Sequence, residues 1–209
     1  MEILEFIDHE LSVDTQMRIA ETDHKLVPKL INPHPDVIKI MVYKSPYLFK
    51  KIKNPTKEMR YAAAEANMES IYTMGELTDD EKLHFFDMHG FQVVGLLKNP
   101  PRIIQEKVIA TGKVIYINSL QHIDTDLQMN MVKENPWSVV WIVFPALETV
   151  DYALSKRADL LNVLWKEIKD IYPIELFSKD TIDNLLGKNI IKETKNGYEL
   201  IKRNSSAVF

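Results

Sequence analysis

The sequence of 209 residues contains no cysteine. A disulfide framework, a structural zinc site built on cysteines and a thiol nucleophile are therefore excluded. Glycine is also scarce, with six residues, and none of the glycine-rich phosphate-binding or nucleophile-elbow motifs occurs. The sequence thus offers no standard loop for holding a nucleotide or presenting a serine nucleophile, and we expect no cofactor.

Long apolar stretches are missing as well. No run approaches the roughly 18 residues that a membrane-spanning helix needs. The first six residues, MEILEF, are acidic and lack the basic region of a signal peptide. We therefore expect a cytoplasmic protein without a membrane partner. The net charge of −4 also argues mildly against a nucleic-acid module, which usually carries a basic stripe.

The six histidines show no metal-binding pattern. His84 and His89 are five residues apart, off a common helical face, and no His-Glu-x-x-His motif occurs. The pair Asp124 and Asp126 lacks the glycine and terminal glutamate of a calcium loop. We therefore predict no metal site, and with no catalytic set in view we expect a protein that is not an enzyme.

What the sequence does contain is a repeat. Slightly altered copies of the stretch NPWSVVWI, which begins at Asn135, recur along most of the chain, and SPYLFKKI at Ser45 is a close copy. The first residues of the copies, called anchors here, are Asp23, Ser45, Asn67, His89, Thr111, Asn135 and Arg157. Five of the six steps between anchors are 22 residues and one is 24. A fixed period of this size indicates a solenoid or array.

Two columns of the repeat are apolar in all seven copies. The residues three before each anchor are Ala20, Val42, Ala64, Phe86, Val108, Val132 and Leu154. The residues four after it are Val27, Phe49, Ile71, Val93, Ile115, Val139 and Leu161. Partly filled apolar columns at −4 and +7 complete a helical stripe on each side of the anchor.

The polar residues of the repeat predict where its helices begin. Most anchors are residues that accept hydrogen bonds at a helix N-terminus, so the anchor is interpreted as the N-cap of a second helix. Eleven residues earlier, a first helix is expected to start at Ser12, Thr56, Thr78 and Asp124, followed by an acidic first turn. Asn-Pro pairs at Asn32, Asn54 and Asn99 predict the turns between repeats.

Each repeat is therefore expected to be two short helices of roughly ten and eight residues. Such helices are stable only when stacked on their neighbours, so we predict an all-α fold, an α-solenoid of about seven helix-turn-helix repeats. The repeats occupy residues 9–165, behind an N-terminal cap at 1–8. The fifth repeat is irregular, and its insertion at 118–124 is the expected place for a bend or a recognition loop.

The repeat fades in residues 166–209. Here we expect a helix at Lys179–Lys188, then two strand-like runs at 189–194 and 198–202, joined through a Lys-Asn-Gly hairpin turn. Helix and hairpin together are interpreted as a terminal cap. The alternative is a winged-helix-like element that recognises nucleic acid.

Aromatic residues supply the candidate binding surface. Trp137 and Trp141 lie four residues apart on one second helix, and a stripe of this kind is either core or an exposed ladder on a binding face. The candidate partner-binding residues are Trp137, Trp141, Tyr47, Lys50, Tyr72, Tyr116 and His122. Lys50, Lys51, Lys53 and Lys57 form a basic cluster, interpreted as a solvated face or, less favourably, a phosphate contact.

The Asn-Pro and Ser-Pro anchors with following apolar pairs, recurring every 22 residues, resemble a tandem short α-helical repeat family of unknown function that is common in bacteriophage proteins. The resemblance covers residues 9–165, and the fifth and seventh repeats depart from it because Thr111-Gly112 and Arg157-Ala158 replace the anchor pair. It implies the fold and a phage setting, and it carries no catalytic residues.

These observations lead to two functional hypotheses. The first is a binding protein whose solenoid surface binds another protein, in a phage setting a host enzyme or defence component in the host cytoplasm. The alternative is a nucleic-acid-binding regulator that uses the C-terminal helix and hairpin. Its candidate contacts are Lys188, Lys192, Lys195, Lys202 and Arg203.

Overall fold

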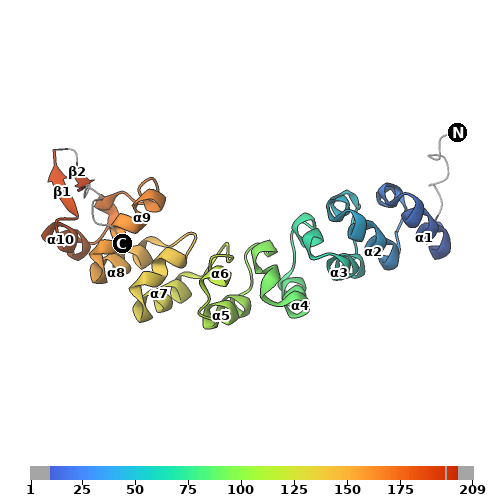
Figure 1. The fold of residues 1–209 in the computed structure, drawn as a ribbon, viewed down its shortest axis with the longest axis horizontal. Helices are drawn as coiled ribbons and strands as arrows, with labels where there is room; N and C mark the ends of the chain where they lie inside the picture. The colour runs from blue at the N-terminus through green and yellow to red at the C-terminus, as the bar shows by residue number, and fades with distance from the viewer. Residues whose placement is uncertain (1–9, 196, 202–209) are drawn as a thin grey trace, which may run out of the picture. The chain divides into compact units, whose positions relative to one another are not determined.

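A computed structural model describes residues 10–195 and 197–201. Most of these residues lie in short helices, and a two-stranded antiparallel hairpin follows near the C-terminal end (Figure 1). The chain divides into two compact units, one up to Ile104 and one from Gln105, each described by itself. The expected cap at 1–8 and the candidate residues Lys202 and Arg203 lie outside the described residues.

The N-terminal unit alternates α-helices with 3-10 helices (Figure 1). In chain order its elements are α1 (Val13–Thr22), η2 (His24–Lys29), α2 (Pro35–Lys44), η3 (Pro46–Lys51), α3 (Lys57–Ala66), η4 (Met68–Thr73), α4 (Asp79–His89) and η5 (Gly90–Leu96). The division between the units falls within α5 (Arg102–Ala110). The 22-residue period of the sequence thus appears as one α-helix and one 3-10 helix per repeat.

The C-terminal unit is less regular. After α5 it contains α6 (Val114–Ile117), α7 (Thr125–Glu134), η6 (Pro136–Trp141), α8 (Leu147–Lys156), η7 (Ala158–Leu160), α9 (Leu161–Ile168), η8 (Ile174–Leu176), α10 (Lys179–Gly187), β1 (Ile191–Thr194) and β2 (Gly197–Leu200). The two strands pair with Ile191 opposite Leu200 and Thr194 opposite Gly197, which confirms the predicted hairpin. The helix predicted before it is confirmed as α10.

The expected eight-residue second helix is wrong in type in five of the seven repeats. The fifth and seventh repeats contain an α-helix there, α6 and α9, whereas the other five form 3-10 helices. Four of them are six-residue 3-10 helices, in which residues i and i+3 lie on the same side. The apolar residues at +4 and +7 are spaced by three, as in Phe49 and Ile52, and both are buried. That spacing fits a 3-10 helix better than an α-helix. Pro28 inside η2 also removes a backbone donor from a longer α-helical ladder.

Polar side chains cap the helices at most of the predicted positions. Asp124 occupies the N-cap position of α7 as predicted, but its side chain makes no capping hydrogen bond. The hydroxyl oxygens of Ser12, Thr56 and Thr78 accept backbone N–H groups of the first turns of α1, α3 and α4, and Thr78 forms a capping box with Glu81. Among the anchors, the side chains of Asp23, Asn67 and Asn135 cap η2, η4 and η6. Ser45, His89 and Arg157 occupy the N-cap position without such a bond, and Thr111 precedes α6 by more than one residue.

The core of the N-terminal unit is built by neighbours in sequence. Consecutive α-helices from α1 to α4 contact each other, and so do consecutive 3-10 helices from η2 to η5. Both invariant apolar columns point into these contacts. Within this unit the columns supply the buried residues Ala20, Val27, Val42, Phe49, Ala64, Ile71, Phe86 and Val93. Removing a large side chain of this kind from water is worth about 1.5–3 kcal/mol.

The core of the C-terminal unit joins α7 and α8 to the last helix and hairpin. Val132, Leu154 and Leu161 belong to one apolar cluster with Leu185 of α10 and Ile191 of β1. The irregular stretch 118–124 contributes to the interior as well, since Leu120 and Ile123 are buried. The extra residues of the fifth repeat are therefore anchored at two points.

Candidate interaction surfaces

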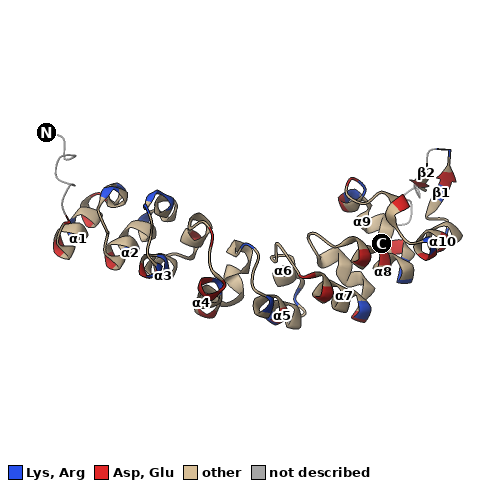
Figure 2. Cartoon of the chain, turned by 180° about the vertical axis from the view of Figure 1, so that it is seen from behind, with Lys and Arg blue, Asp and Glu red and all other residues tan. Residues whose placement is uncertain are grey.

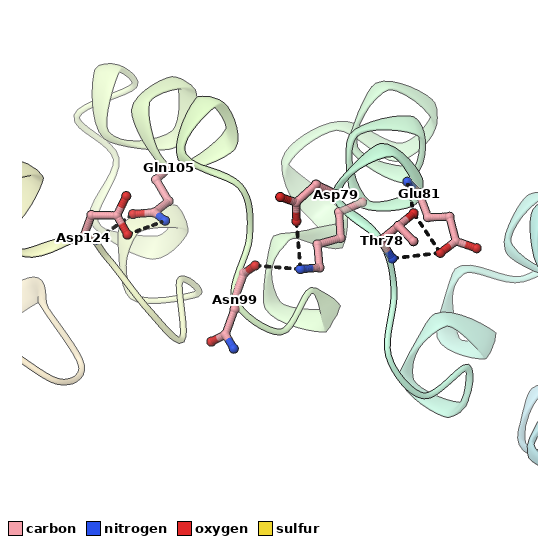
Figure 3. A network of polar contacts seen from close by, with 7 residues as sticks. Thr78, Asp79, Glu81, Asn99, Gln105 and Asp124 are labelled. Carbon is pink, nitrogen blue, oxygen red and sulfur yellow. Dashed lines mark hydrogen bonds and ion pairs between the residues drawn. The ribbon is translucent and has the colours of Figure 1, made fainter.

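Buried glutamines tie three of the α-helices, α1, α5 and α7, to the start of a later one. The side-chain carbonyl of Gln16 accepts the backbone N–H of His34 at 2.9 Å, and that of Gln128 accepts the N–H of Ala146 at 2.8 Å. Gln105 makes the same contact with Asp124 at 2.7 Å (Figure 3). All three glutamines are the fourth residue of their helix and bind the N-cap residue of another. The bonds hold the entry loops of the helices in place.

Cations replace glutamine at the same helical position in α3 and α4. Arg60 donates to the carbonyl oxygen of Glu76 at 2.9 Å, and Lys82 donates to that of Asn99 at 2.9 Å (Figure 3). Arg60 also lies 3.6 Å from the carboxylate of Glu81, whose side chain is only 8% exposed. A buried carboxylate is costly unless it is paired, so this contact ties α3 to α4.

A second series of bonds satisfies carbonyl groups at the helix C-termini. Asn67 donates to the carbonyl oxygen of Val42 at 3.5 Å, and Nε2 of His89 donates to that of Ala64 at 3.0 Å. The last carbonyls of an α-helix have no partner within the helix. The anchors Asn67 and His89 therefore bond to the α-helix of a preceding repeat in addition to marking the start of the 3-10 helix in their own.

The polar bridges continue into α10. The carboxylate of Asp151 on α8 accepts the N–H of Ser178, the N-cap of α10, at 2.8 Å, and Asn184 donates to the carbonyls of Leu154 and Ser155 at 3.2 and 3.0 Å. The first bond resembles the glutamine contacts to N-cap N–H groups, and the bonds of Asn184 resemble the contacts of Asn67 and His89 to carbonyl groups at helix C-termini. α10 therefore docks on α8 with the same chemistry.

An apolar cleft opens in the C-terminal unit. Its volume is about 400 Å³, and its wall includes Trp141, Phe144, Val163 and Ile171. Phe144 is 69% exposed, Ile171 55% and Val163 50%. Large apolar side chains gathered around one cavity on a protein surface are typical of a binding site.

The loop that carries Phe144 is held rigidly. Gln128 donates to the carbonyl oxygen of Phe144 at 3.3 Å while accepting the N–H of Ala146, and the hydroxyl of Tyr172 donates to the carbonyl oxygen of Pro145 at 3.0 Å. The exposed phenyl ring therefore projects from a fixed backbone. A pre-organised apolar group loses little entropy when a partner covers it.

A second cleft lies in the N-terminal unit and is rimmed by lysine. Its volume is about 530 Å³, and its wall combines Lys29 and Lys53 with the apolar Leu30, Ile31 and Ile52. A third, of about 370 Å³, lies between the turns after η4 and η5, beside Tyr72, Lys82 and Lys98. These clefts occupy the side of the unit where the 3-10 helices pass into the next repeat.

The aromatic candidates from the sequence lie at the surface. Trp137 is 36% exposed, and the guanidinium of Arg157 lies over its ring at 5.4 Å. Tyr47 is 57% and Tyr72 65% exposed. Trp141 is partly buried in the wall of the apolar cleft.

The remaining candidates are divided between the two units. Lys50 is exposed on η3. Tyr116 is partly buried with the ammonium of Lys113 5.6 Å from its ring, and His122 is exposed with Nε2 3.3 Å from the carboxylate of Asp124. Tyr47, Lys50 and Tyr72 belong to the N-terminal unit and the other four candidates to the C-terminal unit. Of the four candidates in the C-terminal unit, Trp141 is the one that lines the apolar cleft.

The basic residues proposed for nucleic-acid contact are dispersed. Lys188 is exposed at the end of α10, and Lys195 is exposed at the hairpin turn. Lys192 on β1 is 3.2 Å from the carboxylate of Glu199 on β2, so its charge is offset by its neighbour across the hairpin. Lys202 and Arg203 are outside the described residues.

Across residues 10–195 and 197–201, no cluster of three or more histidine and carboxylate side chains could hold a metal ion. In the same residues, no helix has the length and apolarity needed to cross a membrane. No protein-family model matches the chain, and comparisons with curated proteins and with solved structures gave no match either.

The candidate partner-binding residues predicted from the sequence include none of the buried glutamines and, of the residues that line the three clefts, only Trp141 and Tyr72. The sequence does contain a signal for the buried glutamines, because Gln16, Gln105 and Gln128 all fall at the fourth position of their helices, beside the apolar stripe. Glutamine is seldom fully buried without a partner, and these are 2–3% exposed. No comparable signal marks the clefts, which depend on how successive turns pack.

Proposed function

We propose that the chain is a non-enzymatic, protein-binding α-solenoid that grips an apolar segment of another protein in its C-terminal cleft. The solenoid arrangement is supported by the contacts between consecutive helices within each unit and by the repeated polar bridges between them. Repeats that contact only their neighbours make extended surfaces suited to binding. The α10 contacts support the interpretation of the C-terminal helix as a cap on this array.

The observation that carries the proposal is the cleft beside Phe144. Apolar side chains from η6, the following loop and α9 meet around one cavity, and the loop is fixed by Gln128. A fixed apolar pocket with aromatic residues is the usual centre of a protein interface. Glu167 adds one acidic group to the wall, so we expect an apolar partner segment that carries a basic residue.

The resemblance to phage repeat proteins gives the proposal a biological setting. In that setting the partner is a host enzyme or defence component that the protein inhibits or redirects in the host cytoplasm. This part of the proposal rests on the resemblance alone, whereas the cleft rests on the geometry of the described residues.

Photocrosslinking tests the proposal. A crosslinking phenylalanine analogue in place of Phe144 should capture a bacterial protein through an apolar segment that carries a basic residue. The variant Phe144→Asp, combined with Ile171→Asp, should lose that partner in a pull-down, because two carboxylates cannot be buried in an apolar pocket without large cost. Val13→Asp is the matched control, since Val13 is 43% exposed at the start of α1, where an acid suits the helix dipole. Equal capture by wild type and the double variant would refute the cleft.

A further inference from the structure

A short stretch of the N-terminal unit has a charge opposite to that of the whole chain. Residues 24–53 contain seven lysines and one aspartate, a net charge of +6, within a chain of net charge −4. Figure 2 shows basic residues on η2 and η3, the two short helices that follow α1 and α2. η2 and η3 also contact each other. Four of the seven lysines, Lys25, Lys29, Lys50 and Lys51, therefore lie on one pair of adjacent elements, and Lys53 follows the second of them directly.

Two of the seven lysines have structural partners. Lys39 pairs with Glu65 at 2.7 Å, which raises the pKa of the lysine through that hydrogen bond, and Lys44 donates to the carbonyl oxygen of Glu21 at 3.0 Å. The other five are called the lysine patch here. The lysine patch consists of the exposed residues Lys25, Lys29, Lys50, Lys51 and Lys53.

The lysine patch is uncompensated within the part of the chain that is described. Among residues 10–195 and 197–201, no carboxylate lies within ion-pair distance of any of its five ammonium groups. Like charges that are close together repel each other, so the patch costs stability in the free protein. An anionic partner would remove this repulsion, and its binding would be strengthened by attraction to all five lysines.

The lysine patch borders a cleft with an apolar wall. Lys29 and Lys53 line the cavity of about 530 Å³ together with Leu30, Ile31 and Ile52. Ile31 is 45% exposed, so an apolar group is available beside the charges. The cleft can therefore take a ligand that offers carboxylates to its rim and apolar side chains to its wall.

The turns that form the cleft are fixed in shape. Asn32 and Asn54 line it in the left-handed conformation, with φ of 49° and 47°, and each is followed by a proline. The N–H of His34, just after the first of these turns, is held by Gln16. A surface that is fixed before binding keeps the entropic cost of association low.

The chemistry of the wall favours a protein segment over nucleic acid. Sites for single-stranded nucleic acid combine basic residues with aromatic rings that stack on bases. The lining of this cleft contains no aromatic residue and several apolar ones, among them Ile31 and Ile52. The patch also lacks arginine, whose planar group binds phosphate with two parallel hydrogen bonds.

We infer that the lysine patch and its cleft bind an acidic segment of a partner protein, with glutamate or aspartate side chains on the lysines and apolar side chains against Ile31 and Ile52. This inference names a second contact surface and rests on the proposed protein-binding function. It places the acidic segment in the N-terminal unit, separately from the apolar cleft beside Phe144.

Fluorescence anisotropy with purified chain and a defined probe tests the inference. The probe is a labelled peptide of glutamates interspersed with leucines, and the reference peptide has every glutamate replaced by glutamine. We expect the acidic peptide to bind, the reference peptide to bind at least about tenfold more weakly, and the affinity to fall as salt is added. Absence of binding, or equal binding of both peptides, would overturn the inference.

Charge-reversed variants locate the site. The double variant Lys29→Glu/Lys53→Glu should weaken binding by about tenfold or more, and Lys25→Glu/Lys51→Glu should act in the same direction. The control Lys133→Glu/Lys179→Glu makes the same change in net charge at exposed positions of the C-terminal unit and should bind as wild type. An equal loss of affinity in the control would show that binding depends on net charge alone, and it would refute the lysine patch as the binding site.

Two further measurements distinguish a nucleic-acid ligand from a protein ligand and the lysine patch from the apolar cleft. A labelled single-stranded DNA that binds more tightly than the acidic peptide would replace the protein partner by a nucleic acid and refute the inference. The variant Phe144→Asp should bind the acidic peptide as wild type does. Failure of the apolar cleft in the pull-down would therefore leave this measurement unaffected, and the two proposals fail separately.

Discussion

The side chain of Gln128 joins two segments of backbone, the residue Ile123 just before α7 and the loop that contains Phe144 and Ala146. Its carbonyl oxygen accepts the N–H of Ala146 at 2.8 Å, and its amide donates to the carbonyl oxygens of Ile123 and Phe144 at 2.8 and 3.3 Å. The residue is only 3% exposed. Few water molecules can reach these groups, so their partners must come from the side chain.

Replacing Gln128 by leucine should lower the free energy of unfolding by about 2–3 kcal/mol. Leucine has a similar size but removes the hydrogen-bond partner of the N–H of Ala146 and of the carbonyl oxygens of Ile123 and Phe144, so these groups lose water without gaining a replacement. Urea unfolding followed by circular dichroism measures the change. Gln92→Leu is the control, because Gln92 is exposed on η5 and should change stability by less than about 0.5 kcal/mol. Equal stability of the two variants would contradict the role of the bridge.

Much of the local structure could be predicted from the sequence because its causes are local. The N-caps at Ser12, Thr56 and Thr78 bind backbone groups three residues away, and the hairpin turn is set by its own residues. The 22-residue period is also visible without any tertiary information. These features depend on spacing within one or two turns of chain, which a sequence displays directly.

The features that were missed depend on how neighbouring repeats pack. The apolar pair at +4 and +7 was read as an α-helix, although a spacing of three suits the 3-10 helix that forms. The partner of Gln16 is 18 residues away, at His34, so a single repeat gives no hint of it. The clefts appear only when two successive turns are set side by side, and their lining residues therefore follow from tertiary structure.

The left-handed backbone of Asn54 provides a second test of the fold. Its φ is 47°, a region that costs most residues with a Cβ atom about 1–2 kcal/mol and that asparagine tolerates. We expect Asn54→Ala to lower the free energy of unfolding by about 1 kcal/mol and Asn54→Gly to leave it within about 0.5 kcal/mol. Chemical denaturation of the three proteins measures both values. Equal destabilisation by alanine and glycine would show that the side-chain amide, rather than the backbone conformation, is what matters.

Thr149 offers a substitution that should stabilise the protein. Its hydroxyl is fully buried at the third position of α8 and has no hydrogen-bond partner among the described residues. Valine has nearly the same shape without the hydroxyl, so Thr149→Val should raise the free energy of unfolding by about 1 kcal/mol or more. Thermal unfolding by calorimetry would record this as a higher Tm.

The same substitution at Thr181 is the matched control for Thr149→Val. Thr181 is also fully buried at the third position of its helix, α10, but its hydroxyl donates to the carbonyl oxygen of Asp151 at 3.2 Å. Thr181→Val should therefore lower stability by about 1 kcal/mol. The pair of variants should move Tm in opposite directions, and a shift of the same sign in both would refute the argument from hydrogen bonding.

Asp159 gives the protein a defined response to acid. Its carboxylate accepts two hydrogen bonds from Arg157, at 2.9 and 2.8 Å, and these lower the pKa of Asp159 below its usual value. A carboxyl whose pKa is lower in the folded state stabilises the fold above its unfolded pKa of about 3.9, and this contribution is lost as pH falls through the folded pKa.

The lowered pKa of Asp159 can be measured directly by NMR titration of its side-chain carboxyl carbon. We expect a midpoint below that of an ordinary aspartate, a rise of the midpoint in Arg157→Gln, and a smaller rise in concentrated salt because both side chains are about half exposed. The difference in unfolding free energy between wild type and Asp159→Asn should be present near pH 6 and vanish once pH falls below the folded pKa. An unchanged midpoint in Arg157→Gln would show that the two hydrogen bonds from Arg157 do not set the pKa of Asp159.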